Sequence, residues 1–246
     1  MALGIAAAGA LAASGAPAAA QAQGAGHGGG VWSLTLYGQE SFPKQTNTND
    51  QIAEINRTFG THFEDWDDTH NLSLGLQLFR RVSPRWQLGL EVDGSRGSIG
   101  GTETVLTEAG PAELEFEQKY DLYADLLGVA HFLPCPSCRR VTPFVLLGAG
   151  VAYEKDTTTL TLRNEYLDSE LTADSDGTFP VYTAGLGLDV PVPAGGPWYL
   201  EVGTAYFWGR FEHRVPARGD LAPAPEVLAD TDSTGPNYWI GIGRRF

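Results

Sequence analysis

After its first residues the sequence has no long apolar run, and it is poor in basic side chains. A transmembrane helix needs about 20 consecutive apolar residues, and no segment beyond the first thirty residues supplies them. There are 16 lysines and arginines against 30 aspartates and glutamates, so the formal net charge is -14. These shortages exclude a helical membrane protein and a nucleic-acid partner bound by phosphate neutralisation.

Cysteine is also scarce. Only Cys135 and Cys138 occur, too few for a disulfide-stapled secreted scaffold. A redox site would need a helix amino terminus in a thioredoxin-like context, and the sequence predicts none there. Zinc would need further ligands, and none lie close by in the sequence. We expect a local disulfide or a plain turn there, with no metal and no cofactor.

The amino-terminal residues have the pattern of an export signal. Residues 1–22 are nearly all alanine, glycine, leucine and isoleucine, and they end in the small-residue pattern Ala20-Gln21-Ala22. We therefore expect a signal peptide at 1–22, a glycine-rich leader at 23–30 and a folded domain at 31–246.

In the folded domain, apolar residues alternate with small or polar ones. In 71–79, for example, leucines at 72, 74, 76 and 78 alternate with Ser73, Gly75 and Gln77. A period of two over about ten residues is typical of a strand with two different faces. Such segments lie at 31–38, 71–79, 86–93, 117–133, 141–153, 182–190, 198–208 and 238–243.

The connections between these eight segments alternate in length. Three are short, at 80–85, 134–140 and 191–197. Four are long, at 39–70, 96–116, 154–180 and 210–236. A soluble β-sandwich also alternates along its strands, but long and short connections in strict turn are the layout of an outer-membrane barrel. The sequence thus predicts an all-β, eight-stranded antiparallel up-and-down transmembrane β-barrel.

Charge distinguishes the two ends of this barrel. The long loops contain about 23 acids and 8 bases, which is essentially the whole net charge. The short-turn end contains no acid, and its bases are Arg80, Arg81, Arg85, Arg139, Arg140, Arg244 and Arg245. We expect the long loops to be extracellular and the short turns periplasmic.

The acids within the strands fall on the small, polar face, and Glu117 is one of them. A charge on the lipid face at mid-membrane costs up to about 2–4 kcal/mol, so we expect these side chains inside the lumen. We also expect an arginine to bridge to Glu91 or Glu201 and close the barrel. The predicted lumen charge cluster is Glu91, Asp93, Lys119, Asp121, Asp125, Asp189, Glu201, Arg81, Arg85 and Arg245.

The last strand has apolar residues at every second position and ends on an aromatic residue. Tyr238, Ile240, Ile242 and Phe246 resemble the sorting signal that the outer-membrane assembly machinery recognises. Residues 23–246 as a whole resemble the small barrels of the opacity-protein and outer membrane protein A type. The resemblance implies a bacterial outer-membrane protein surrounded by lipid and lipopolysaccharide, with a surface ligand that stays unknown.

An enzyme of this architecture would need a serine or histidine nucleophile system with an orienting acid. No compact pairing of that kind stands out, and His70 beside Asp67 and Asp68 fits a solvated acidic loop. Eight strands enclose a lumen that side chains can fill. We therefore expect a non-enzymatic barrel that anchors and presents acidic loops. The alternatives are a narrow cation or small-solute channel and a lipid-modifying enzyme.

Overall fold

The structure is a computed structural model. It describes residues 32–43, 45–66, 71–108, 110–138, 140–192, 196–219, 226–232 and 234–246. The expected signal peptide and leader lie outside these ranges, as do His70, its two aspartates and Arg139. Within the described ranges, no helix has the length and apolarity that a membrane crossing requires.

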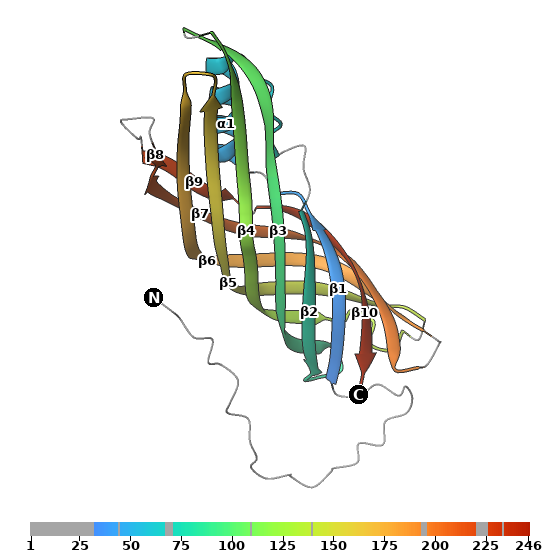
Figure 1. The fold of residues 1–246 in the computed structure, drawn as a ribbon. Helices are drawn as coiled ribbons and strands as arrows, with labels where there is room; N and C mark the ends of the chain where they lie inside the picture. The colour runs from blue at the N-terminus through green and yellow to red at the C-terminus, as the bar shows by residue number, and fades with distance from the viewer. Residues whose placement is uncertain are drawn as a thin grey trace.

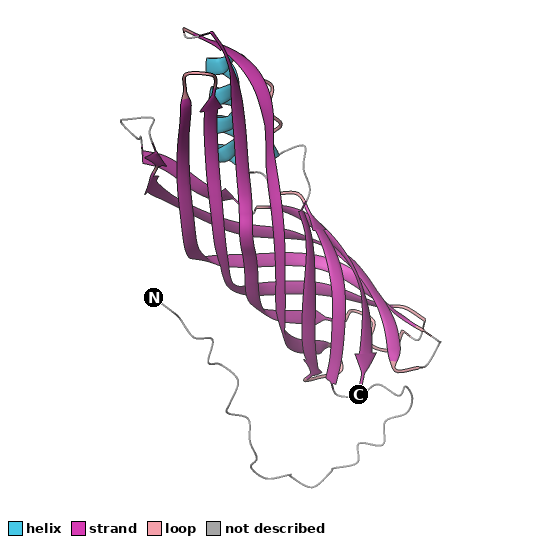
Figure 2. Ribbon diagram, viewed as in Figure 1, coloured by secondary structure: helices cyan, strands magenta, loops and turns pink. Residues whose placement is uncertain are grey.

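Eight long strands form a closed antiparallel ring (Figures 1 and 2). Strands β1 to β7 pair in chain order, β7 pairs with β10, and β10 pairs with β1, so the first and last strands close the ring. The ring strands are β1 (Trp32–Ser41), β2 (Asn71–Arg81), β3 (Trp86–Thr107), β4 (Gly110–Phe132), β5 (Thr142–Arg163), β6 (Asp168–Pro191), β7 (Trp198–Pro216) and β10 (Gly235–Arg245). The predicted eight-stranded barrel is confirmed.

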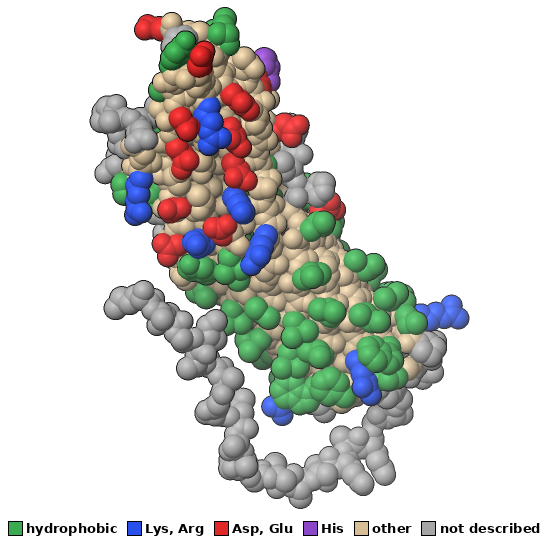
Figure 3. Space-filling view, in the orientation of Figure 1, with side chains coloured by type: hydrophobic (Ala, Val, Ile, Leu, Met, Phe, Trp, Pro, Cys, Tyr) green, Lys and Arg blue, Asp and Glu red, His purple; other side chains and the backbone are tan. Residues whose placement is uncertain are grey.

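The ring strands expose large apolar side chains on the outside of the barrel, which form an apolar belt, and on the face seen in Figure 3 they gather over the lower part of the ring. The four leucines of β2 are 39–72 % exposed, whereas Ser73, Gln77 and Phe79 of the same strand are buried in the lumen. Aromatic side chains border the belt as expected of interface girdles: Trp32, Trp86 and Trp198 at the short-turn end, and Tyr206, Trp208 and Tyr238 toward the other end. Outward leucines at this density fit lipid, so the fold is that of a transmembrane barrel.

Two of the predicted long loops are strands. Segments 96–116 and 154–180 continue the β3–β4 and β5–β6 hairpins, and their pairing runs on to Thr107–Gly110 and Arg163–Asp168. Together they form a sheet that rises beyond the ring (Figure 1). We call it the tower: residues 97–107, 110–120, 155–163 and 168–176. The expectation of loops there was wrong, because alternation in 112–120 continues the strand pattern past the membrane.

The other two long connections hold additional elements. Segment 39–70 contains the helix α1 (Thr46–Phe59), which ends at Gly60, a residue with a φ of 70°. Segment 210–236 contains the end of β7 and the short strands β8 (Arg218–Gly219) and β9 (Glu226–Asp232). These strands pair with β6 and β7 respectively.

Helix α1 and the residues after it cover the inner face of the tower. Trp66 packs against Tyr120 with the rings tilted and a centroid distance of 4.8 Å, and its Nε1 donates a hydrogen bond to Gln118 Oε1 at 2.7 Å. The side chain of Asn56 accepts from the Phe63 backbone N–H at 2.8 Å and fixes this segment. The apolar core of the tower comprises Ile52, Phe63, Trp66, Ile99, Val105, Ala112, Leu114, Phe116 and Tyr120.

A β-bulge in β4 separates the tower from the membrane ring. Between Tyr120 and Leu122 the pairing with β5 advances by two residues on β4 and by one on β5, which leaves Asp121 as the extra residue. Below the bulge the odd-numbered residues of β4 face inward, and above it the even-numbered ones do. One inserted residue thus exchanges the two faces of β4, as period-two geometry requires.

The packing of the tower gives a testable difference between two leucines of one hairpin. Leu114 is fully buried and Leu106 is 87 % exposed. We expect Leu114→Ala to destabilise the tower by about 2–5 kcal/mol, because it leaves a cavity in the core. Leu106→Ala should change it by less than about 0.5 kcal/mol. Hydrogen exchange of the tower amides in the folded barrel measures both, and equal protection in the two variants would contradict this packing.

Candidate functional site: a packed lumen below an acidic tower

Five of the predicted lumen acids do lie inside the barrel. They come from β3, β4, β6 and β7, and each is only 2–8 % exposed. These residues are Glu91, Asp93, Asp125, Asp189 and Glu201. Strand alternation alone was enough to predict them, since each lies below the bulge of β4 or on a strand without one.

Three other predicted residues lie outside. Glu117 and Lys119 are exposed on the outer face of the tower, and Asp121 is half-buried there. The Asp121 carboxylate lies 4.0 Å from Lys119 Nζ and 3.8 Å from Lys155 Nζ. Their placement in the lumen was wrong because the bulge reverses the inward and outward positions of β4.

Neutral donors, not arginines, bind the two deepest glutamates. Glu91 accepts hydrogen bonds from Tyr37 Oη and Gln77 Nε2, both at 2.9 Å. Glu201 accepts one from Trp239 Nε1 at 2.9 Å and a longer one from Thr35. The expected arginine bridge to Glu91 or Glu201 was therefore wrong.

The arginine bridge is made lower down, to Asp189. Arg245 Nη2 donates to Asp189 Oδ2 at 2.7 Å, and its guanidinium lies 4.5 Å from the ring centre of Tyr199. An arginine at the end of a strand reaches only the nearest layer of the lumen. Arg81 ends β2 near this pair, whereas Arg85 is exposed in the adjacent turn.

Large side chains fill the lumen between these polar groups. The His131 ring lies between Phe79 and Phe144, with both centroid distances at 4.1 Å. Inward-facing glycines make room for other rings: a Cβ on Gly75 would overlap Tyr37, and one on Gly203 would overlap Trp239. The small face predicted from the sequence is thus small because aromatic rings from neighbouring strands lie over it.

At its upper end the lumen opens into a cavity of about 50 Å³. Its wall includes the three carboxylic acids Asp93, Asp125 and Glu154, which come from adjacent strands. Tyr123 and Phe207 contribute aromatic surface to it. This cavity could not be predicted from the sequence, because the rim residues after β1 and before β10 lay in predicted loops.

The outer face of the tower is acidic (Figure 3). Glutamates of β4 flank a row of threonines on β5, at positions 157, 159 and 161, and acids of β6 flank it on the other side. On the opposite face, burial raises the pKa of Asp156 to about 6. The acidic face comprises Glu113, Glu115, Glu117, Asp121, Asp168, Glu170, Asp174 and Asp176, with the bases Lys119, Lys155 and Arg163.

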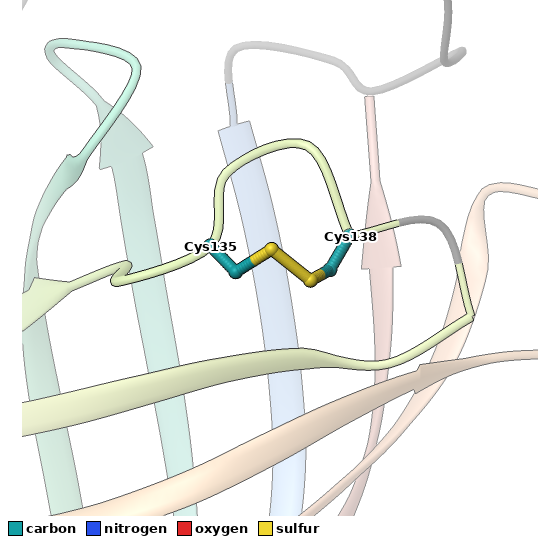
Figure 4. Close-up of a disulfide and its surroundings, with 2 residues drawn as sticks. All are labelled: Cys135 and Cys138. Carbon is teal, nitrogen blue, oxygen red and sulfur yellow. A yellow bond between two sulfur atoms is a disulfide. The ribbon is translucent and has the colours of Figure 1, made fainter.

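The turn between β4 and β5 contains the disulfide Cys135–Cys138 (Figure 4). The Cys138 backbone N–H donates to the Cys135 carbonyl at 3.2 Å, so the bridge closes one tight turn. Of the two expectations for this turn, the structure has the disulfide. The four residues of the predicted assembly signal, at 238, 240, 242 and 246, are exposed on the outside of the barrel, and their recognition stays a prediction.

Comparison with known proteins shows similarity of fold alone. No protein-family model matches the chain, and no curated protein matches it. The outer membrane protein OprG of Pseudomonas aeruginosa is 16 % identical, with 90 % of this chain and 98 % of that chain covered and a TM-score of 0.46. Ail, the attachment invasion locus protein of Yersinia pestis, is 15 % identical over 87 % and 97 %, with a TM-score of 0.36.

The outer membrane protease OmpT of Escherichia coli is 11 % identical, with 91 % of this chain and 99 % of that chain covered and a TM-score of 0.39. OprG and OmpT are described as outer-membrane proteins. At these identities the likeness concerns the barrel alone and assigns no activity.

The Arg245–Asp189 pair should stabilise the lower lumen. Removing one partner of a buried pair typically costs about 3–5 kcal/mol, so we expect Arg245→Met to lower the free energy of unfolding in lipid vesicles by up to that amount. Asp189→Asn in the same chain should recover part of the loss. Arg244→Met is the matched control, because Arg244 is exposed and lies over Trp198. Equal losses for Arg244→Met and Arg245→Met would contradict the assigned pair.

Proposed function

We propose that this protein is an integral outer-membrane barrel with a closed lumen, which anchors the acidic tower and displays it at the cell surface. The observation that carries the proposal is the division of one sheet into two parts. Strands β3 to β6 expose large apolar side chains outside the ring, and where they continue into the tower β4 and β6 expose acids on its outer face. Such a molecule has one part suited to lipid and one suited to water.

The anchoring role is supported by the ring itself. All neighbouring ring strands are hydrogen-bonded, including β1 with β10, so the membrane part has no open edge. In lipid, closure of this kind is required because nothing else can satisfy backbone N–H and C=O groups. The aromatic side chains at both borders hold the belt at the level of the headgroups.

The closed lumen is supported by its packing. The His131 ring is stacked on Phe144 and packs against the tilted ring of Phe79, and Trp239 lies beside Phe144 at a centroid distance of 6.4 Å. Below these rings, the Arg245–Asp189 pair occupies the lower end. This arrangement favours an anchor over the cation channel that the sequence left as an alternative.

A role without catalysis is supported by the two histidines whose side chains the structure describes. His131 is 2 % exposed and packed between two phenylalanines, so substrate cannot reach it. His62 is exposed, with Nδ1 3.8 Å from a Glu103 oxygen, and an exposed pair of that kind is a common surface feature. We propose that the protein acts by display and not by catalysis.

Orientation can be tested with single cysteines, since the structure describes no free cysteine. Glu165 is exposed at the tip of the tower, and Pro84 is exposed in the turn between β2 and β3. We expect a membrane-impermeant maleimide to label Glu165→Cys in intact cells. Pro84→Cys should react only after the outer membrane is permeabilised. Labelling of Pro84→Cys alone in intact cells would reverse the proposed orientation.

Closure can be tested by conductance in planar bilayers. We expect the refolded wild-type protein to give no steady channel current, because aromatic side chains fill the lumen. The Phe144→Ala, Trp239→Ala double variant removes two of those rings and serves as the open control. Steady cation-selective current through the wild-type protein would contradict the closed lumen and favour the channel function.

A further inference from the structure

The cavity at the upper end of the lumen has an unusual wall. Asp93 and Asp125 lie directly opposite each other on β3 and β4. Glu154 on β5 is two residues above Ala152, the partner of Asp125. All three acids are buried, and among the described residues that line the cavity there is no lysine, arginine or histidine.

The hydrogen-bond donors that the structure shows for Asp93 are neutral and distant. Asp93 Oδ2 accepts hydrogen bonds from Tyr37 Oη and Gln39 Nε2, both at the long distance of 3.4 Å. Like charges directly opposite each other on paired strands are destabilising, and a buried carboxyl group takes up a proton unless a counter-charge or strong donors are present. A bound cation would supply that counter-charge to the pair formed by Asp93 and Asp125.

The buried polar atoms of the wall that have no hydrogen-bond partner within the described part of the chain include Asp125 Oδ1 and Ser73 Oγ, in residues that are 4 % and 7 % exposed. Both residues line the cavity. Buried polar atoms in folded proteins are nearly always paired. Each of these two oxygens is therefore available to accept a hydrogen bond from a bound ligand.

The placement of the oxygen atoms and aromatic rings in the cavity wall decides which kind of cation fits. The described acidic, histidine and cysteine side chains do not converge on a common point where three of them could hold a metal ion. An ammonium group instead has three N–H donors and can use neutral hydroxyl or amide oxygens beside a single carboxylate, so it does not need three acids at one point. The rings of Tyr123 and Phe207 suit its alkyl chain and its charge, since cations are attracted to aromatic faces.

We propose that this cavity is a binding site for a small organic cation with a primary ammonium group, which enters from the tower side. The ammonium group donates to Asp125 Oδ1 and Ser73 Oγ, and the short alkyl chain lies along the aromatic wall. A cavity of about 50 Å³ holds a few non-hydrogen atoms, about as many as three or four water molecules. The site depends neither on the displayed face of the tower nor on an open lumen.

The probe for the test is n-butylammonium chloride, with n-butanol as its neutral counterpart of the same length. Isothermal titration calorimetry on the full chain refolded in detergent should give saturable one-site binding of butylammonium and none of butanol. Asp125→Asn removes the charge and keeps the shape, and we expect about a tenfold loss of affinity. Ser73→Ala removes one neutral acceptor and should lose about threefold.

Asp174→Asn is the matched control, because it removes one acid from the exposed face of the tower. It should bind butylammonium like the wild type, and circular dichroism should report the same strand content for all variants. The proposal is overturned if Asp125→Asn and Ser73→Ala both bind like the wild type. It is also overturned if butanol binds equally well, or if calcium chloride binds in an Asp125-dependent way and butylammonium does not.

Discussion

Inside the hydrocarbon layer every backbone amide and carbonyl has to find its partner within the protein, because lipid offers none. In this chain the requirement is met by one continuous set of strand pairings, from β1 round to β10 and back to β1. The other features of the barrel depend on that closure. A ring of eight strands has a narrow interior, and the side chains that point inward must fill it.

The buried acids of the lumen have three different kinds of surroundings along the barrel axis. At the lower end a full ion pair joins Arg245 and Asp189. In the middle, uncharged donors from tyrosine, glutamine and tryptophan side chains bind Glu91 and Glu201. At the upper end the acids face a cavity. From the lower end toward the tower, the contacts of the buried acids thus change from an ion pair to neutral hydrogen bonds and then to a cavity wall.

The sequence predicted the membrane part well and the part above it poorly, for one physical reason. Side-chain alternation determines which residues face lipid, so the belt and five lumen acids could be read from single strands. Asp121 defeats the same reasoning, because an inserted residue has no signature in composition and yet exchanges the faces of Lys119 and Glu117. The pairing of Arg245 with Asp189 could not be predicted from the sequence either. It depends on how far along the barrel axis each side chain lies, and side-chain alternation does not give that position.

The pairing of β1 with β10 also bears on how the molecule forms. Most contacts in the ring join hairpin neighbours, but Ser33 pairs with Arg245 and Ser41 with Asn237, residues from opposite ends of the folded domain. Contacts so distant along the chain form slowly, since a long loop must close before they contribute. Until they form, β1 and β10 are two unpaired edges, and such edges invite association with other chains. The chain must therefore be kept from self-association between synthesis and insertion, and the whole domain must be complete before its membrane part can become a closed barrel.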